Sequence, residues 1–223
     1  MDVASGTIVV YADIACPWAH VTVHRLHETR ARLGVHVELD HRAFPLELFN
    51  SRPTPKATLD AEIAVLAGAE PGAGWHAWTK PAHAYPVSSL LALEAVQAAK
   101  DQGARAAENL DRELRRALFA RNECISMFHV VVEAAERALG VDAAVLRDAL
   151  VSGRCRRAVF EQMDEAKREN VKGSPHLFLS DGSDFPNPGI EKEWICGEEG
   201  DGFVVIHKDD PSIYEDIVRA AAR

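Results

Sequence analysis

One cysteine at the start of a predicted helix is the residue of this chain best suited to covalent chemistry. In the segment DIACPWAH, Cys16, Pro17 and Trp18 follow a β-branched run, and Ala19 stands where a dithiol motif has its second cysteine. A helix N-terminus presents unpaired N–H groups and a partial positive charge, which stabilise a thiolate and lower the pKa of a thiol. Pro17 suits the first helical position because it has no N–H to leave unpaired. The pattern predicts a reactive thiol rather than a small buried apolar side chain, which is the alternative.

Ala19 restricts the chemistry that Cys16 can complete. Disulfide exchange passes through a mixed disulfide, which a dithiol protein resolves with its own second cysteine. Here the release of such an adduct needs an external thiol or a distant cysteine. The other cysteines are too far apart for a zinc motif and are expected to be structural free thiols: Cys124, Cys155 and Cys196.

Three histidines follow Cys16 on one side of the predicted helix, at i+4, i+8 and i+11: His20, His24 and His27. Cysteine and histidine at such spacing can bind a transition metal, but histidines on a helix that packs against a sheet are often only hydrogen-bonded. We therefore predict no metal site. His20, one turn beyond Cys16, is expected to modulate the pKa of the thiol.

The elements around Cys16 are predicted as strand, helix and strand. GTIVVYADI is a buried-strand pattern, Gly34 closes the helix, and VHVELDHRAF alternates as a second strand, which favours a parallel βαβ unit. Prolines and glycines over residues 50–87 predict an irregular segment without a long helix, in which Trp75 and Trp78 anchor a loop.

The second half of the chain is predicted to be helical and then to return to strands. Helices are expected between Ser88 and about Asn170, with caps at Ser88 or Ser89, Ser126 and Asp142. HLFLSDG and DGFVVIHKDD predict two strands, and Asp210–Pro211 predicts the start of a last helix. NPG at 187–189 and GEEGDG at 197–202 are expected to be turns. Without the helical block the order is βαβ–ββα.

Composition excludes several classes of partner. The chain has 25 basic and 34 acidic residues and a net charge of −9, which argues against nucleic-acid binding. No stretch predicts a membrane span, and the N-terminus lacks the pattern of a signal peptide. We therefore expect a cytoplasmic protein whose cysteines stay reduced. No oligomeric state follows from the sequence.

Four segments in order resemble the DsbA-like branch of the thioredoxin superfamily. They are VVYADIACPWAHVTVHRL, VELDHRAFPLELFN, RALFARNECISMFHVVVEAAERALG and VKGSPHLFLSDG. The chain is most similar to the cytoplasmic FrnE-type proteins, and more distantly to 2-hydroxychromene-2-carboxylate isomerases and kappa-class glutathione transferases. The resemblance implies an α/β, thioredoxin-like fold over residues 1–54 and 166–223, with an all-helical domain inserted over 55–165.

The resemblance also implies that Pro175 is a cis-proline opposite Cys16. The backbone of Ser174 would then be open to pair with an extended substrate, and His176 could tune the thiolate or carry a proton. An ordinary turn and a surface histidine are the alternatives. Pro17, Trp18, Ser174 and His176 are expected to contact the substrate, with Cys16 and Pro175 at the reaction centre.

Three functions follow from these expectations. The first is a monothiol thiol–disulfide oxidoreductase or isomerase that acts on protein or small-molecule disulfides. The second is a glutathione-dependent isomerase or transferase, and the third is a non-catalytic binding protein with a thioredoxin fold. No tightly bound cofactor is expected; glutathione or another low-molecular-weight thiol is the small molecule that the first two functions imply.

Overall fold

A computed structural model describes residues 1–195 and 202–223 and has an α/β architecture. Its central sheet has four strands in the order β2-β1-β3-β4, and β1 pairs in parallel with β2 and antiparallel with β3. The strands are β1 (Thr7–Ala12), β2 (Glu38–Ala43), β3 (His176–Phe178) and β4 (Asp184–Pro186). The predicted βαβ unit at the N-terminus is confirmed, and so is the α/β class.

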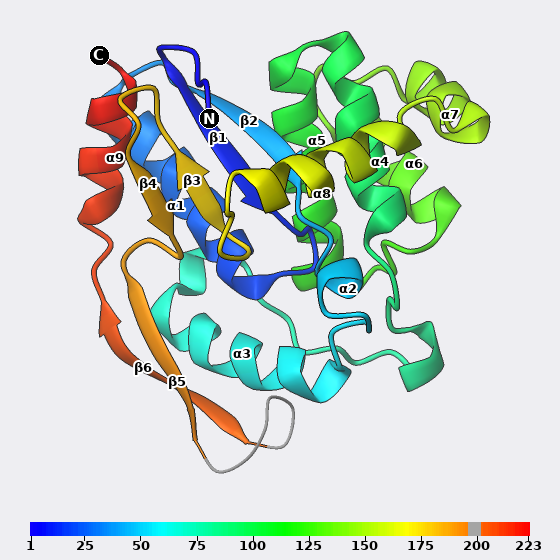
Figure 1. The fold of residues 1–223 in the computed structure, drawn as a ribbon. Helices are drawn as coiled ribbons and strands as arrows, with labels where there is room; N and C mark the ends of the chain where they lie inside the picture. Colours follow the sequence, from blue (N-terminus) through cyan, green and yellow to red (C-terminus); the bar gives the residue numbers. More distant parts are fainter. Residues whose placement is uncertain (196–201) are drawn as a thin grey trace.

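Helices cover both faces of this sheet (Figure 1). Alternate residues of β1 point to opposite faces, so Ile8 and Val10 pack against α1 (Pro17–Leu33) and α9 (Ile213–Ala221). Val9 and Tyr11 face the other way and share a cluster with Ala166 of α8 (Arg156–Arg168). The strand β1 is thus buried on both sides, and its C-terminal end leads directly into the loop that carries Cys16.

Another group of helices forms a second apolar core beside β2, which includes Leu93, Leu110, Leu114 and Leu146. These helices are α4 (Leu90–Ala99), α5 (Ala104–Phe119), α6 (Phe128–Arg137) and α7 (Ala143–Ser152), with short 3₁₀ turns at Pro71–Ala73, Ala82–Ala84 and Lys100–Gln102. They gather at one side of the sheet in Figure 1. A separate inserted domain over residues 55–165 remains our proposal.

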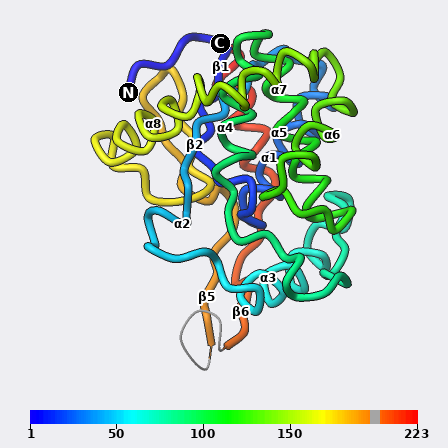
Figure 2. Tube along the Cα trace, turned by 90° about the vertical axis from the view of Figure 1, so that its right-hand side faces the viewer, coloured from blue at the N-terminus to red at the C-terminus, as the bar shows by residue number. Residues whose placement is uncertain are grey.

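The expectation that residues 50–87 hold no long helix is wrong. The 14-residue helix α3 (Lys56–Ala69) lies there, after the short helix α2 (Leu46–Phe49). Pro55 is the N-cap residue of α3 and Pro71 begins the following 3₁₀ turn, so the prolines flank the helix instead of interrupting it. Leu66 packs into the core shared with α1, and Figure 2 shows α3 at the same end of the molecule as β5 and β6. Trp75 and Trp78 do pack against the body, as predicted.

Both predicted C-terminal strands are present, and two strands that were not predicted lie between them, β4 and β5. HLFLSDG contains β3, but the strand in DGFVVIHKDD is β6 (Phe203–Asp209), which pairs with β5 (Ile190–Ile195) in a separate two-stranded sheet. The central sheet instead takes β4 as its edge strand. The predicted turn at NPG lies between β4 and β5, where Asn187 and Gly189 have φ values of 46° and 78°. Most of GEEGDG, together with Cys196, lies outside the described residues.

The predicted helix ends have mixed outcomes. Gly34 ends α1 with a φ of 63°, and the Asp142 carboxylate accepts the first free N–H groups of α7, both as expected. Ser126 caps no helix: its hydroxyl donates to the carbonyl of Ser88, and α6 begins two residues later. Asp210 accepts the N–H and hydroxyl of Ser212, so α9 begins at Ile213. No helix in the described part of the chain is long and apolar enough to cross a membrane.

Candidate active site

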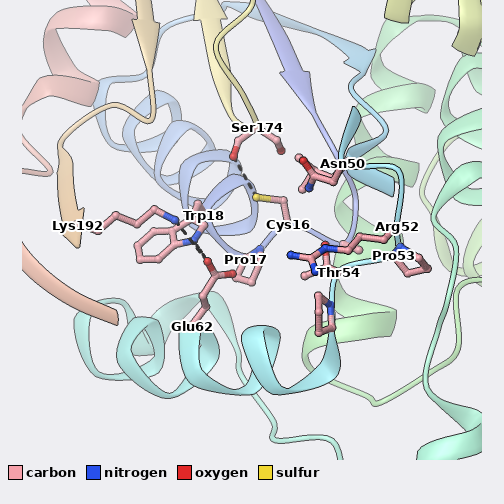
Figure 3. A pocket seen from close by; sticks show the side chains of 13 residues that line it. Cys16, Pro17, Trp18, Asn50, Arg52, Pro53, Thr54, Glu62, Ser174 and Lys192 are labelled. Atoms are coloured by element: carbon pink, nitrogen blue, oxygen red, sulfur yellow. Dashed lines mark hydrogen bonds and ion pairs between the residues drawn. The ribbon is translucent and has the colours of Figure 1, made fainter. Parts of the chain in front are cut away.

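Cys16 is the N-cap residue of α1 and lines a cavity of about 380 Å³ (Figure 3). Its side chain is 3% exposed, and Sγ donates a hydrogen bond of 3.1 Å to the carbonyl oxygen of Ser174. Pro17 is the first residue of the helix, as predicted, and also lines the cavity. The thiol is therefore placed at a helix N-terminus and faces the loop before β3, but it is almost wholly enclosed by protein.

The expected lowering of the thiol pKa is wrong. Burial, and after it the negative charge of Glu62, raise the pKa of Cys16 to about 11. Hydrogen bonding by Ser174 and by the backbone of Ala19 lowers the pKa, and so does the ammonium group of Lys192, but these effects do not offset the first two. Sequence patterning finds the helix N-terminus, but desolvation of a thiolate depends on packing, and here it outweighs the partial charge of the helix. At neutral pH the side chain is a thiol.

Trp18, Glu62 and Lys192 form one wall of the cavity. Trp18 Nε1 donates to Glu62 Oε1 at 2.6 Å. Lys192 Nζ lies 3.4 Å from the same oxygen and 4.0 Å from the centre of the Trp18 ring. The three side chains come from α1, α3 and β5 and converge beside Cys16 in Figure 3. A buried carboxylate is costly unless it is hydrogen-bonded and paired, and this one has both kinds of partner.

The opposite wall carries polar side chains from the segment between α2 and α3. Asn50, Arg52 and Thr54 line the cavity there, and Arg52 extends toward its centre in Figure 3. Together with Lys192, Arg52 places positive charge on two sides of the thiol. Such groups suit a ligand that carries carboxylates next to the sulfur that reacts. The other lining residues are Ala15, Leu46, Pro53 and Pro55.

The loop before β3 is joined to the Cys16 loop by two hydrogen bonds of Ser174. Its carbonyl accepts the Cys16 thiol, and its hydroxyl accepts the backbone N–H of Asp13 at 2.9 Å. The Ser174–Pro175 peptide bond is cis. The carboxylate of Asp13 in turn accepts the N–H groups of Ala15 and Leu46, each at 2.8 Å. Three loops that are distant in sequence are thereby held around one sulfur atom.

His20 does not modulate the thiol as predicted. Its ring lies between Trp75 and Phe119, and Nε2 donates to the carbonyl of Ala73 at 3.0 Å. Burial lowers the pKa of His20 to about 3, so the ring is neutral, and it is not among the residues that line the cavity. The i+4 spacing places His20 one turn from Cys16, but the side chain packs against the helical core.

The expectation that His176 contacts the substrate is also wrong. It is buried in β3, where Nε2 donates to Asp184 Oδ1 at 2.8 Å and Nδ1 accepts the N–H of Lys172 at 3.1 Å. The ring contacts Phe178 on the sheet and does not line the cavity. Its hydrogen bonds connect β4 to the segment before Pro175, so it supports the loop and has no direct path to a substrate.

The remaining predicted candidates are dispersed. His24 lies 3.7 Å from Glu70, and the Nδ1 of His27 is 2.9 Å from Arg30. Cys124 and Cys155 are free thiols, each half-buried.

Sequence reasoning missed Glu62 and Lys192, and it also missed the polar residues of the opposite wall, Asn50, Arg52 and Thr54. Glu62 carried a weak signal, because Thr58, Leu59, Ile63 and Leu66 share its helical face and are buried. A charged residue at the centre of such a face requires a partner inside the protein. Lys192 carried none: it lies in a strand of alternating charge, EKE, that is typical of an exposed edge.

Comparison with known proteins agrees with this arrangement. The model of the DSBA-like thioredoxin domain family matches residues 7–192. A comparison with curated protein sequences finds no match.

Several solved structures share the fold. A probable DsbA oxidoreductase from Streptomyces coelicolor is 20% identical, with a TM-score of 0.65 over 96% of this chain and 89% of that one. The cytosolic disulfide reductase DsbM from Pseudomonas aeruginosa, solved with GSH, is 16% identical, with a TM-score of 0.64 over 96% of each chain. A 2-hydroxychromene-2-carboxylate isomerase is 16% identical, with a TM-score of 0.56 over 80% of this chain and 87% of that one.

Proposed function

Because the chain belongs to the DSBA-like thioredoxin domain family, we propose that it is a monothiol thiol–disulfide oxidoreductase or isomerase with Cys16 as its nucleophile. The observation that carries the proposal is the position of the Cys16 sulfur, which lines a cavity at a helix N-terminus while alanine occupies the position of a resolving cysteine. Ala19 has no sulfur, so no thiol stands at that position of the helix.

The reaction consists of two exchanges. Cys16 loses its proton to solvent, and the thiolate attacks one sulfur of a bound disulfide. The S–S bond breaks, the second sulfur leaves as a thiolate and takes up a proton, and a mixed disulfide remains on Cys16. An external thiol then attacks the ligand sulfur of this adduct, and Cys16 leaves with the bonding electron pair. The net result is disulfide exchange between two external molecules.

A low-molecular-weight thiol such as glutathione suits the second step. Arg52 and Lys192 line the cavity and can pair with carboxylates of a small peptide, while Asn50 and Thr54 offer hydrogen bonds. The cytosolic, GSH-bound DsbM structure supports the choice of thiol and a cytoplasmic site of action, although its similarity concerns the fold. No tightly bound cofactor has a part in this scheme.

Intact mass spectrometry after incubation with oxidised glutathione tests the proposal. The wild type should gain one glutathione, the Cys16→Ser variant none, and Cys124→Ser, Cys155→Ser and Cys196→Ser variants one each. Loss of the adduct on adding reduced glutathione would complete the exchange cycle. An adduct that persists in Cys16→Ser would contradict the assignment of the nucleophile.

A second function is favoured by the burial of the thiol. A protonated, enclosed Cys16 could bind the small thiol without exchanging disulfides, as a glutathione-dependent isomerase or transferase or as a binding protein would. Thermal stabilisation by reduced glutathione in the absence of any adduct with the oxidised form would favour this function over disulfide exchange. The same pair of measurements therefore distinguishes the two.

A further inference from the structure

The Cys16 thiol shares its cavity with one carboxylate and one ammonium group that contact each other. Glu62 Oε1 accepts the indole N–H of Trp18 at 2.6 Å and lies 3.4 Å from Lys192 Nζ. Glu62 is 4% exposed, whereas Lys192 is more open to solvent and stacks 4.0 Å from the centre of the Trp18 ring. Trp18 is two residues from Cys16 in the first turn of α1, so its contacts with Glu62 and Lys192 place both charged groups beside the loop that carries the thiol.

We propose that Glu62 and Lys192 are positioning residues that act on Cys16 through their charges, Glu62 slowing and Lys192 assisting formation of the nucleophilic thiolate. The inference rests on the proposed function for its purpose, but the thiol chemistry it describes can be measured without any disulfide. A buried negative charge near a sulfur opposes its ionisation, and a nearby ammonium favours it. The electrostatic effects on Cys16 have these two signs.

Other charged groups near Cys16 do not replace this pair. Besides Cys16, the titratable side chains that line the cavity are Arg52 before α3, Glu62 on α3 and Lys192 on β5. Asp13 and Tyr85 line a neighbouring cavity, and Arg115 on α5 contacts the backbone of Asp13 from behind. Arg115 is bound to Asp111 and to the carbonyl of Asp13. Burial raises the pKa of Tyr85, which keeps it neutral. Glu62 joins the tryptophan of the CPW segment to a cation.

The consequence is a thiol that stays protonated at rest and whose attack rate depends on two residues from other elements. Removing the negative charge with Glu62→Gln keeps an oxygen to accept the Trp18 N–H. The pKa of Cys16 should fall by about one unit. Tenfold more thiolate, partly offset by lower nucleophilicity, gives about threefold faster attack at neutral pH. Lys192→Met keeps the apolar stem over the indole and should shift both quantities in the opposite direction.

The test is the rate of carbamidomethylation of Cys16 by iodoacetamide across pH, read by peptide mass in a background in which Cys124, Cys155 and Cys196 are serine. Asp60→Asn on α3 and Lys208→Met on the β5–β6 hairpin are matched controls, since both side chains are exposed and outside the cavity. Opposite shifts for Glu62→Gln and Lys192→Met, with unchanged controls, would support the pair.

Shifts of the same sign, or rates equal to those of the controls, would overturn it. Lys192→Met removes a partly exposed side chain, so its result stands even where Glu62→Gln lowers stability. The failure of the proposed function is distinguishable: opposite alkylation shifts without any glutathione adduct would retain the pair and reject disulfide exchange. A glutathione adduct together with unchanged alkylation rates would support disulfide exchange and reject the action of Glu62 and Lys192 on the thiol.

Discussion

The thiol of Cys16 donates a hydrogen bond to the carbonyl oxygen of Ser174, although 158 residues separate them in the chain. The hydroxyl of Ser174 also accepts the N–H of Asp13, three residues before Cys16. One serine therefore contacts the thiol with its backbone and the thiol loop with its side chain. The reacting sulfur and the loop that faces it are positioned by the same residue.

The Ser174→Ala variant should lower the free energy of unfolding by about 1–3 kcal/mol. The substitution leaves the buried N–H of Asp13 without its acceptor, and an unsatisfied buried donor carries the cost of desolvation. Urea unfolding measures the change. Ser212→Ala is the control, because its hydroxyl bonds to Asp210 at an exposed site and should cost less than about 0.5 kcal/mol. Equal effects in the two variants would reject the tie between the loops.

The Ala19→Cys variant should convert the site to a dithiol. Position 19 follows Cys16 in the first turn of α1, the arrangement in which a second thiol can resolve a mixed disulfide. Oxidised glutathione should then leave an internal disulfide, so the intact mass falls by two hydrogens and no adduct accumulates. Ala15→Cys, before the helix, is the control for simply adding a thiol. A lasting adduct on Cys16 in Ala19→Cys would show that position 19 cannot reach the sulfur.

Local patterns predicted the elements that carry the site, and packing decided its chemistry. The strand before Cys16, the helix after it and its end at Gly34 are set by residues close in sequence, and all three were predicted correctly. Burial of the thiol and the charge of Glu62 arise from contacts over 40 residues or more, and no local pattern carries them. For this reason the predicted direction of the pKa shift was wrong although the helix N-terminus was right.

The histidines also show that a local pattern does not predict where a side chain points. Spacing predicted that His20 lies one turn from Cys16, which is correct, but a helix has several faces and the ring packs toward Trp75. His176 follows the proline of the facing loop, but alternation along β3 turns its side chain away from the cavity. Adjacency along the chain therefore does not predict which side chains share a cavity.

The His176→Ala variant should destabilise the fold by about 2–4 kcal/mol and leave the pKa of Cys16 near its wild-type value. The imidazole is buried and bridges Asp184 and the Lys172 N–H, so its removal leaves a cavity and an unpaired donor. Urea unfolding and the pH dependence of alkylation measure the two quantities. Asp184→Asn, at a half-exposed position, should cost less than about 1 kcal/mol. A large shift in the alkylation profile of His176→Ala would restore a direct role at the thiol.

His20 should make the fold less stable as the pH falls below neutral. Burial lowers the pKa of His20 to about 3, so the folded protein keeps the ring neutral while the unfolded chain binds a proton near pH 6.5. The unfolded state then binds more protons, and the free energy of unfolding decreases as the pH falls from about 6.5 toward 3. Between pH 7 and 5 this loss amounts to about 2 kcal/mol for one such group.

Urea unfolding at several pH values in this window measures the slope. His20→Gln cannot gain a proton but keeps an amide N–H for the Ala73 carbonyl, so its slope should be flatter than that of the wild type. His36→Gln replaces an exposed ring and serves as the control for the loss of a histidine. Burial lowers the pKa of His27 to about 3 as well, so part of the slope should persist in His20→Gln. A slope in His20→Gln as steep as in the wild type would mean that the His20 ring accepts its proton without opening the core around Trp75 and Phe119.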